Sequence, residues 1–83
     1  MDDDDLEIAI GQLRLVKNAK IHVYFEPECK FYELYDLQQS DLFCVLNIIN
    51  NTNNQLKAKI LTTTGVGWID CGWISTCYSK VIT

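Results

Sequence analysis

The sequence predicts an all-β fold, a small barrel of five to six short strands at residues 20–83 behind an N-terminal extension at residues 1–19. The chain has 83 residues, of which 48% are hydrophobic and 22% charged, which is enough apolar material for one core but too short a chain for two. From residue 21 onward, short apolar runs are separated by segments rich in Asn, Thr and Gly. No stretch there has the length and period of a helix.

The N-terminal extension begins with a dense acidic run, since five of the eleven acidic residues lie in the first seven positions. We interpret this run as a solvated chain end, although it could also dock on a basic partner or cap a helix. The apolar residues that follow fit two structures. Leu6, Ile10 and Leu13 have the spacing of a short helix, whereas Leu13 and Leu15 alternate as in a strand. Gly11 interrupts the helix, so the strand is favoured.

The first barrel strand is predicted where Ile21, Val23 and Phe25 alternate with more polar residues, and Pro27 should end it. Residues 28–41 form a longer, partly extended excursion. The next elements are a strand rich in β-branched residues, an Asn-rich turn, a half-exposed strand, a glycine-bearing turn and three short apolar segments: residues 42–49, 50–54, 56–61, 64–67, 68–69, 72–74 and 80–82.

Three segments resemble the Src-homology-3 (SH3) family. VYFEPECKFYELYDLQQSD, residues 23–41, is similar to the family's first strand and long RT loop, with VYFEP in place of the ALYDY motif. The residues Asn50-Asn51-Thr52 match the polar loop after the second strand. GWIDCGWI, residues 67–74, resembles the family's GYIPSNYV, and TTTGVGWI resembles the GxxGWV of bacterial SH3 domains. The resemblance implies an SH3-like barrel with a single helical turn after residue 69.

The resemblance also departs from the family where peptide ligands bind. Proline-rich ligands of SH3 domains lie across paired aromatic residues. Phe25 and Trp73 fall on two of these positions. However, Pro27 and Asp70 replace two other groove residues, and Gln55 lies near the place of the specificity tryptophan. We therefore expect a contact that differs from conventional proline-rich recognition.

A protein-binding face is predicted because nine aromatic residues are too many for the core of so small a barrel, so some must be exposed. In the SH3 family, acids of the long loop meet basic ligand residues. The predicted binding residues are Phe25, Tyr32, Glu33, Tyr35, Asp36 and Trp73.

The expected function is a non-catalytic protein–protein interaction or assembly module, either as a homo-oligomer or within a larger complex. Similar small SH3-like proteins are structural components of bacteriophage particles, so a virion component is one form of this hypothesis. The alternative is a cell-wall (peptidoglycan) binding module of the bacterial SH3 type.

Other functions are disfavoured by composition and spacing. The net charge of -4 predicts no nucleic-acid partner. The sequence has no long apolar run and no basic leader, which predicts a cytoplasmic chain outside membranes, with reduced cysteines. We expect no catalytic site, metal or cofactor, because the only histidine, His22, has no nucleophile at a recognisable spacing and the cysteines lack the paired spacing of a zinc site.

Overall fold

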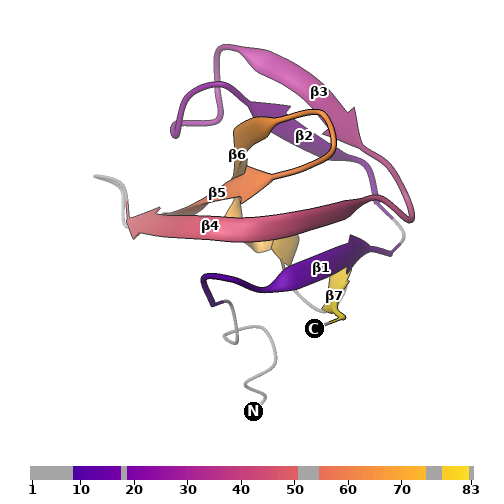
Figure 1. Ribbon diagram of the computed structural model, residues 1–83. Coiled ribbons are helices and arrows are strands. Elements are labelled where there is room, and N and C mark those ends of the chain that lie inside the picture. The colour runs from indigo at the N-terminus through magenta and orange to yellow at the C-terminus, as the bar shows by residue number, and fades with distance from the viewer. Residues whose placement is uncertain (1–8, 18, 51–54, 75–77, 83) are drawn as a thin grey trace.

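The computed structural model describes residues 9–17, 19–50, 55–74 and 78–82. Its strands form one antiparallel sheet in the order β3-β2-β6-β5-β4-β1-β7, which curls into a half-barrel (Figure 1). The elements are β1 (Leu13–Val16), β2 (Ile21–Tyr24), β3 (Glu33–Leu37), β4 (Leu42–Asn50), β5 (Leu56–Leu61), β6 (Val66–Asp70), the 3-10 turn η2 (Cys71–Ile74) and β7 (Ser79–Val81). The all-β class is confirmed, but the seven strands exceed the five to six predicted.

Strand β1 resolves the ambiguity of the N-terminal extension for residues 13–16. It pairs with β4 on one side and with β7 on the other, so the favoured strand is confirmed there and the helix is wrong. Arg14 and Val16 point inward while Leu13 and Leu15 are half-buried, as the period of two requires. The division of the chain at residue 19 stays a prediction. Three features of the sequence lie outside the described residues: the N-terminal segment 1–8 with its acidic run, residues 51–54 of the Asn-rich turn, and Cys77.

Strand β3 was not predicted as a strand from the sequence. It lies within the excursion predicted at residues 28–41 and pairs with β2 as an antiparallel hairpin. The alternation is irregular along β3, because only Leu37 is fully buried and the first two residues are exposed. The resemblance places the VYFEP segment in the first strand. Here β1 precedes it, so the segment begins in β2, the second strand along the chain, and continues into the loop that follows. A further prediction is confirmed, since a helical turn, η2, follows β6 directly.

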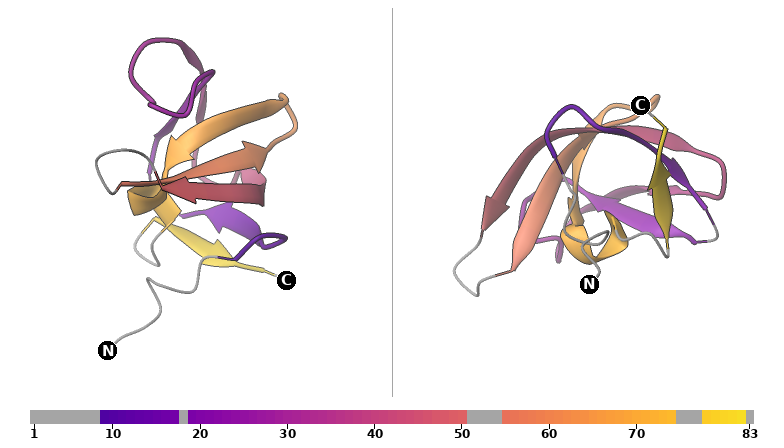
Figure 2. Two further views of the ribbon diagram at one scale, coloured as in Figure 1. Left: turned by 90° about the vertical axis from the view of Figure 1, so that its left-hand side faces the viewer. Right: turned by 90° about the horizontal axis from the view of Figure 1, so that it is seen from below.

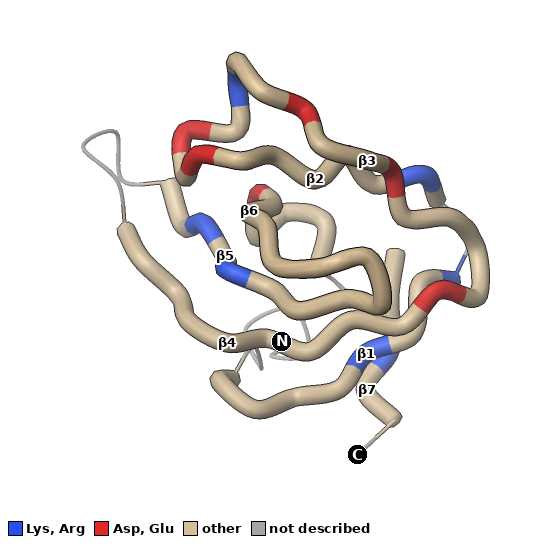
Figure 3. Tube along the Cα trace, turned by 45° about the horizontal axis from the view of Figure 1, so that its top comes forward, with Lys and Arg blue, Asp and Glu red and all other residues tan. Residues whose placement is uncertain are grey.

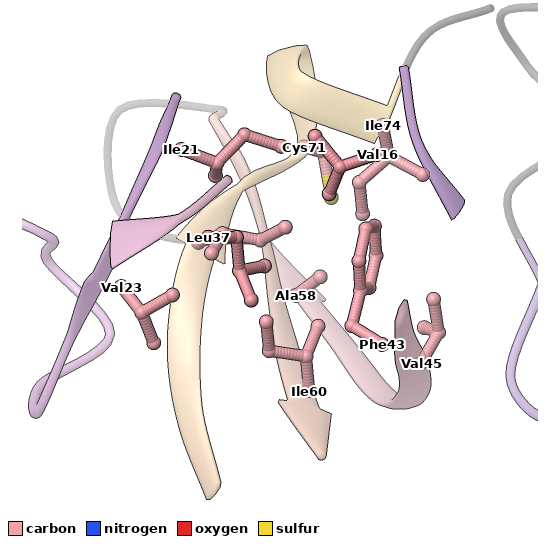
Figure 4. Close-up of a cluster of buried hydrophobic side chains, with 11 residues drawn as sticks. Val16, Ile21, Val23, Leu37, Phe43, Val45, Ala58, Ile60, Cys71 and Ile74 are labelled. Carbon is pink, nitrogen blue, oxygen red and sulfur yellow. The ribbon is translucent and has the colours of Figure 1, made fainter. Parts of the chain in front are cut away.

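Figure 2 shows how the sheet curls, and the core side chains lie inside this curl (Figure 4). The hydrophobic members of the core are Val16, Ile21, Val23, Leu37, Phe43, Val45, Ala58, Ile60, Ile69, Cys71 and Ile74. Fully burying one of the Val, Leu, Ile or Phe side chains among them contributes about 1.5–3 kcal/mol relative to leaving it exposed. The core therefore draws on every strand except β7, together with η2.

A buried polar contact joins β7 to β1. Arg14 is almost fully buried, and its Nε donates to the Ser79 Oγ at 2.8 Å. Its Nη2 donates to the Ser79 backbone oxygen at 3.2 Å, and its Nη1 to the Gln12 Oε1 at 3.0 Å. Burial lowers the pKa of the Arg14 guanidinium, so these acceptors compensate for the lost hydration.

Within the described ranges, no helix has the length and apolar character needed to cross a membrane.

Candidate functional site

The loop between β2 and β3 presents three aromatic side chains to solvent. Phe25, Phe31 and Tyr32 are 68%, 75% and 69% exposed, which is unusual for large apolar groups on so small a domain. We call residues 25–32 the aromatic loop; it projects at one end of the half-barrel (Figure 1). Its two ends are joined by a backbone hydrogen bond from the Phe25 N–H to the Tyr32 oxygen at 2.7 Å.

The carboxylate of Glu26 fixes the backbone of the aromatic loop. Its Oε2 accepts hydrogen bonds from the N–H groups of Lys30 at 2.9 Å and Phe31 at 3.0 Å, and its Oε1 accepts one from Tyr32 at 3.1 Å. Desolvation raises the pKa of Glu26, but these backbone donors outweigh it and lower the pKa to about 2. The exposed rings are therefore carried by an ordered loop, which reduces the conformational entropy lost on binding.

Acids outnumber lysines along the β2–β3 hairpin and the segments that flank it, whereas the neighbouring strand β5 carries basic residues, as Figure 3 shows. Residues 20–41 carry five acids and two lysines: Glu26, Glu28, Glu33, Asp36, Asp41, Lys20 and Lys30. A basic partner would be attracted to this side, because complementary charge speeds encounter and selects among partners.

Two of the predicted acids, Glu33 and Asp36, converge on His22. Asp36 stands opposite His22 in the β2–β3 ladder. The His22 Nδ1 lies 2.6 Å from the Asp36 Oδ1 and 2.7 Å from the Glu33 Oε2. Hydrogen bonds to Asp36 and then to Glu33 raise the pKa of His22, while hydrogen bonding with Glu33 and then with His22 lowers the pKa of Asp36. Lys20 Nζ lies 3.6 Å from the other Asp36 oxygen, Oδ2.

Tyr35, another predicted binding residue, is half-buried against the core. Its hydroxyl is hydrogen-bonded to the Thr62 Oγ1 at 2.7 Å and donates to the Gly65 backbone oxygen at 3.1 Å. These contacts attach strand β3 to the turn between β5 and β6. Tyr35 therefore supports the hairpin from its inner side.

Trp73 lies in η2, half-buried against the core. Its ring meets that of Tyr78 edge to face, with centroids 5.0 Å apart. Both rings line an open pocket of about 280 Å³ together with Asp70 and Gly72, and Asp70 pairs with Lys57 at 3.1 Å. Within the described part of the chain, no other predicted binding residue lines this pocket.

A second open pocket, of about 270 Å³, lies on the outer side of β1, β4 and β5. Its apolar lining includes Leu13, Cys44 and Leu61, which stand in register on these three strands, with Val66 next to Leu61 on β6. This apolar row is not visible in the sequence, because its members come together only through strand pairing.

The six predicted binding residues thus occupy three places. Phe25 and Tyr32 lie on the aromatic loop; Glu33, Tyr35 and Asp36 lie on strand β3; Trp73 lies in its own pocket. Sequence reasoning missed Phe31, the most exposed of the three rings, and the convergence of Glu33 and Asp36 on His22. The only signal for Phe31 was its place in the polar excursion beside Tyr32.

Comparison with known proteins gives no match: no protein-family model, no curated protein and no solved structure matches this chain. The functional proposal therefore depends on the geometry above.

Proposed function

We propose that this chain is a non-catalytic protein-binding module whose contact face is the aromatic loop. The observation that carries the proposal is the trio of exposed rings, Phe25, Phe31 and Tyr32, on a backbone ordered by Glu26. Binding energy at protein interfaces is concentrated in a few residues, often aromatic, at the centre of the contact. An ordered loop that exposes three of them has the composition of such a centre.

We infer further that the half-barrel is SH3-like. In support, a glycine-bearing turn joins β5 to β6, and η2 stands between β6 and β7. The β2–β3 hairpin ends in a loop with aromatic and acidic residues, which is how the RT loop of that family meets its ligands. A component of a larger assembly, such as a bacteriophage particle, is one setting for such a module.

The partner we propose is a protein surface with an apolar depression bordered by Lys or Arg. The depression would receive the Phe31 and Tyr32 rings, and the basic border would face the acids of the β2–β3 side. Rim charges of this kind contribute to association rate and selectivity, while the buried rings determine the dissociation rate.

The test compares three forms of the chain as bait for partner capture from cells that produce it. The Phe31→Ala/Tyr32→Ala double variant removes two exposed rings. The matched control is Leu61→Ala, which removes an apolar side chain that is 45% exposed in the second pocket. Matching far-ultraviolet dichroism and thermal unfolding establish that all three are folded.

We expect the wild type and Leu61→Ala to retain the same protein, identified by mass spectrometry, and the double variant to bind it at least about tenfold more weakly, which corresponds to about 1.4 kcal/mol. Equal affinity of all three forms would refute the aromatic loop as the contact face. Loss confined to Leu61→Ala would move the contact to the outer apolar row. Sedimentation of the chain with peptidoglycan, with no protein retained, would favour the cell-wall alternative.

A further inference from the structure

We propose that His22, Glu33 and Asp36 form a binding site for a divalent transition-metal ion, Zn²⁺ in the first instance. This inference does not rest on the aromatic rings that carry the proposed function, but it shares Glu33 and Asp36 with the acids proposed to face the partner's basic border. It departs from the expectation of no metal, which the cysteine spacing alone suggested. The ligand set combines one imidazole nitrogen with two carboxylate oxygens, and all three donor atoms lie within 4.8 Å of one another.

An irregularity of the β2–β3 ladder brings the third ligand to the site. His22 faces Asp36, but the register shifts between Val23 and Tyr24, so that Tyr24 stands opposite Glu33 and Leu34 is the extra residue. In a regular ladder Glu33 would point to the opposite face of the sheet from Asp36. The bulge places both carboxylates on the face of His22, and bulges commonly redirect a side chain in this way at functional sites.

The distances fit an ion after a small adjustment. The His22 Nδ1 is 2.6 Å and 2.7 Å from the two carboxylate oxygens. Zn²⁺ binds nitrogen and oxygen at about 2.0–2.2 Å, which sets neighbouring ligand atoms about 3.4 Å apart in a tetrahedron. Around an ion, the His22 Nδ1 would therefore move away from each of the two carboxylate oxygens by less than about an ångström. His22 and Glu33 are each 44% exposed, so solvent can fill the remaining coordination position.

The charges of the cluster also bear on cation binding. With neutral imidazole, the two carboxylates carry two negative charges, and Lys20, whose Nζ lies 3.6 Å from the Asp36 Oδ2, offsets one of them. The second charge is offset either by a proton on His22 or by a bound cation, so a metal ion and that proton compete for the same place. Lys20 contacts the Asp36 Oδ2, which leaves the Oδ1 directed toward His22. A contact of this kind orients a metal-ligating carboxylate from outside the coordination sphere.

The donor set narrows the choice of metal. An imidazole with carboxylates suits Zn²⁺, Co²⁺ or Mn²⁺, whereas Mg²⁺ and Ca²⁺ prefer oxygen alone. Burial raises the pKa of the Cys29 and Cys71 thiols to about 11, so at these two cysteines the thiolate that a metal binds is costlier to form. An ion here would link β2 to β3 and so stabilise the hairpin that carries the aromatic loop.

The test is isothermal titration calorimetry of the full chain with Zn²⁺ at pH 7.5. We expect one equivalent to bind the wild type, and His22→Ala and Asp36→Asn each to weaken the affinity at least about tenfold. The matched control is Glu28→Gln, which removes an acid of the same hairpin outside the cluster and should bind as the wild type does. Thermal unfolding without metal establishes that each variant is folded.

A second measurement locates the ion. Paramagnetic Co²⁺ should broaden or shift the amide resonances of β2 and β3 in the wild type and leave those of His22→Ala unchanged. Absence of stoichiometric binding to the wild type would overturn the proposal. So would equal affinity of the His22→Ala variant, or a thiolate-to-cobalt charge-transfer band that disappears in Cys29→Ser.

Discussion

Replacing Gly67 by alanine should lower the free energy of unfolding by about 1–3 kcal/mol, the usual range for overpacking a tight core. Strand β6 passes so close to β2 here that a Cβ on Gly67 would overlap the Cγ1 of Val23 and lie 3.2 Å from the Tyr24 backbone oxygen. Val23 is fully buried and β-branched, so its side chain cannot easily turn away. Without the overlap the sign would reverse, because alanine is favoured over glycine inside a strand by about 0.5–1 kcal/mol.

Urea denaturation followed by tryptophan fluorescence measures this change. The matched control is Gly72→Ala, whose Cβ would meet only the Asp70 Oδ1 at an ordinary 3.5 Å and should change stability by less than about 0.5 kcal/mol. The Val23→Ala/Gly67→Ala double variant should be less destabilised than the sum of its single changes, by about 0.5–3 kcal/mol. Additive effects, or a Gly67→Ala variant as stable as Gly72→Ala, would refute the close approach of the two strands.

Two further predictions follow from the buried arginine and the aromatic loop. Ser79→Ala should lower the free energy of unfolding by about 1–3 kcal/mol because Arg14 Nε loses its acceptor inside the protein; an unchanged urea midpoint would contradict this. The pKa of Glu26 is lowered to about 2 from 4.5, so its stabilising effect is present above about pH 4.5 and is lost as the pH falls toward 2. The Phe31 amide resonance should follow that titration with a midpoint near pH 2; a midpoint near 4.5, or the same titration in Glu26→Gln, would contradict it.

The sequence predicted the fold best where alternation was regular and local. Ile21 and Val23 alternate with polar neighbours and are indeed buried in the core. At residues 13–16 the apolar spacing alone fitted both strand and helix, and only Gly11 favoured the strand, because the pairing of β1 with β4 and β7 that decides the matter joins segments far apart in the chain. Strand β3 was missed for a different reason, since its ladder contains a bulge and its burial does not alternate.

The candidate site was less predictable than the fold because it depends on register and on loop contacts. The surplus of aromatic residues predicted that some rings, Phe25 and Tyr32 among them, would be exposed. Phe31 lies in a loop, where no strand or helix periodicity indicates which side chains face solvent. The order of that loop comes from three hydrogen bonds to Glu26, and nothing in the sequence distinguishes this carboxylate from the other acids of residues 20–41. The convergence on His22 required knowledge of the bulge, which a single sequence does not display.

The half-barrel leaves β3 and β7 at the two edges of its sheet, and edge strands are where separate copies of a protein can join. The charges on these edges bear on that risk. Glu33 and Asp36 lie on β3, whereas Lys80 lies on β7. Two copies meeting through the same edge would bring like charges together, which opposes symmetric stacking into fibrils. Contact between β3 of one copy and β7 of another meets no such repulsion. Copies added in this way would all face the same direction along the assembly.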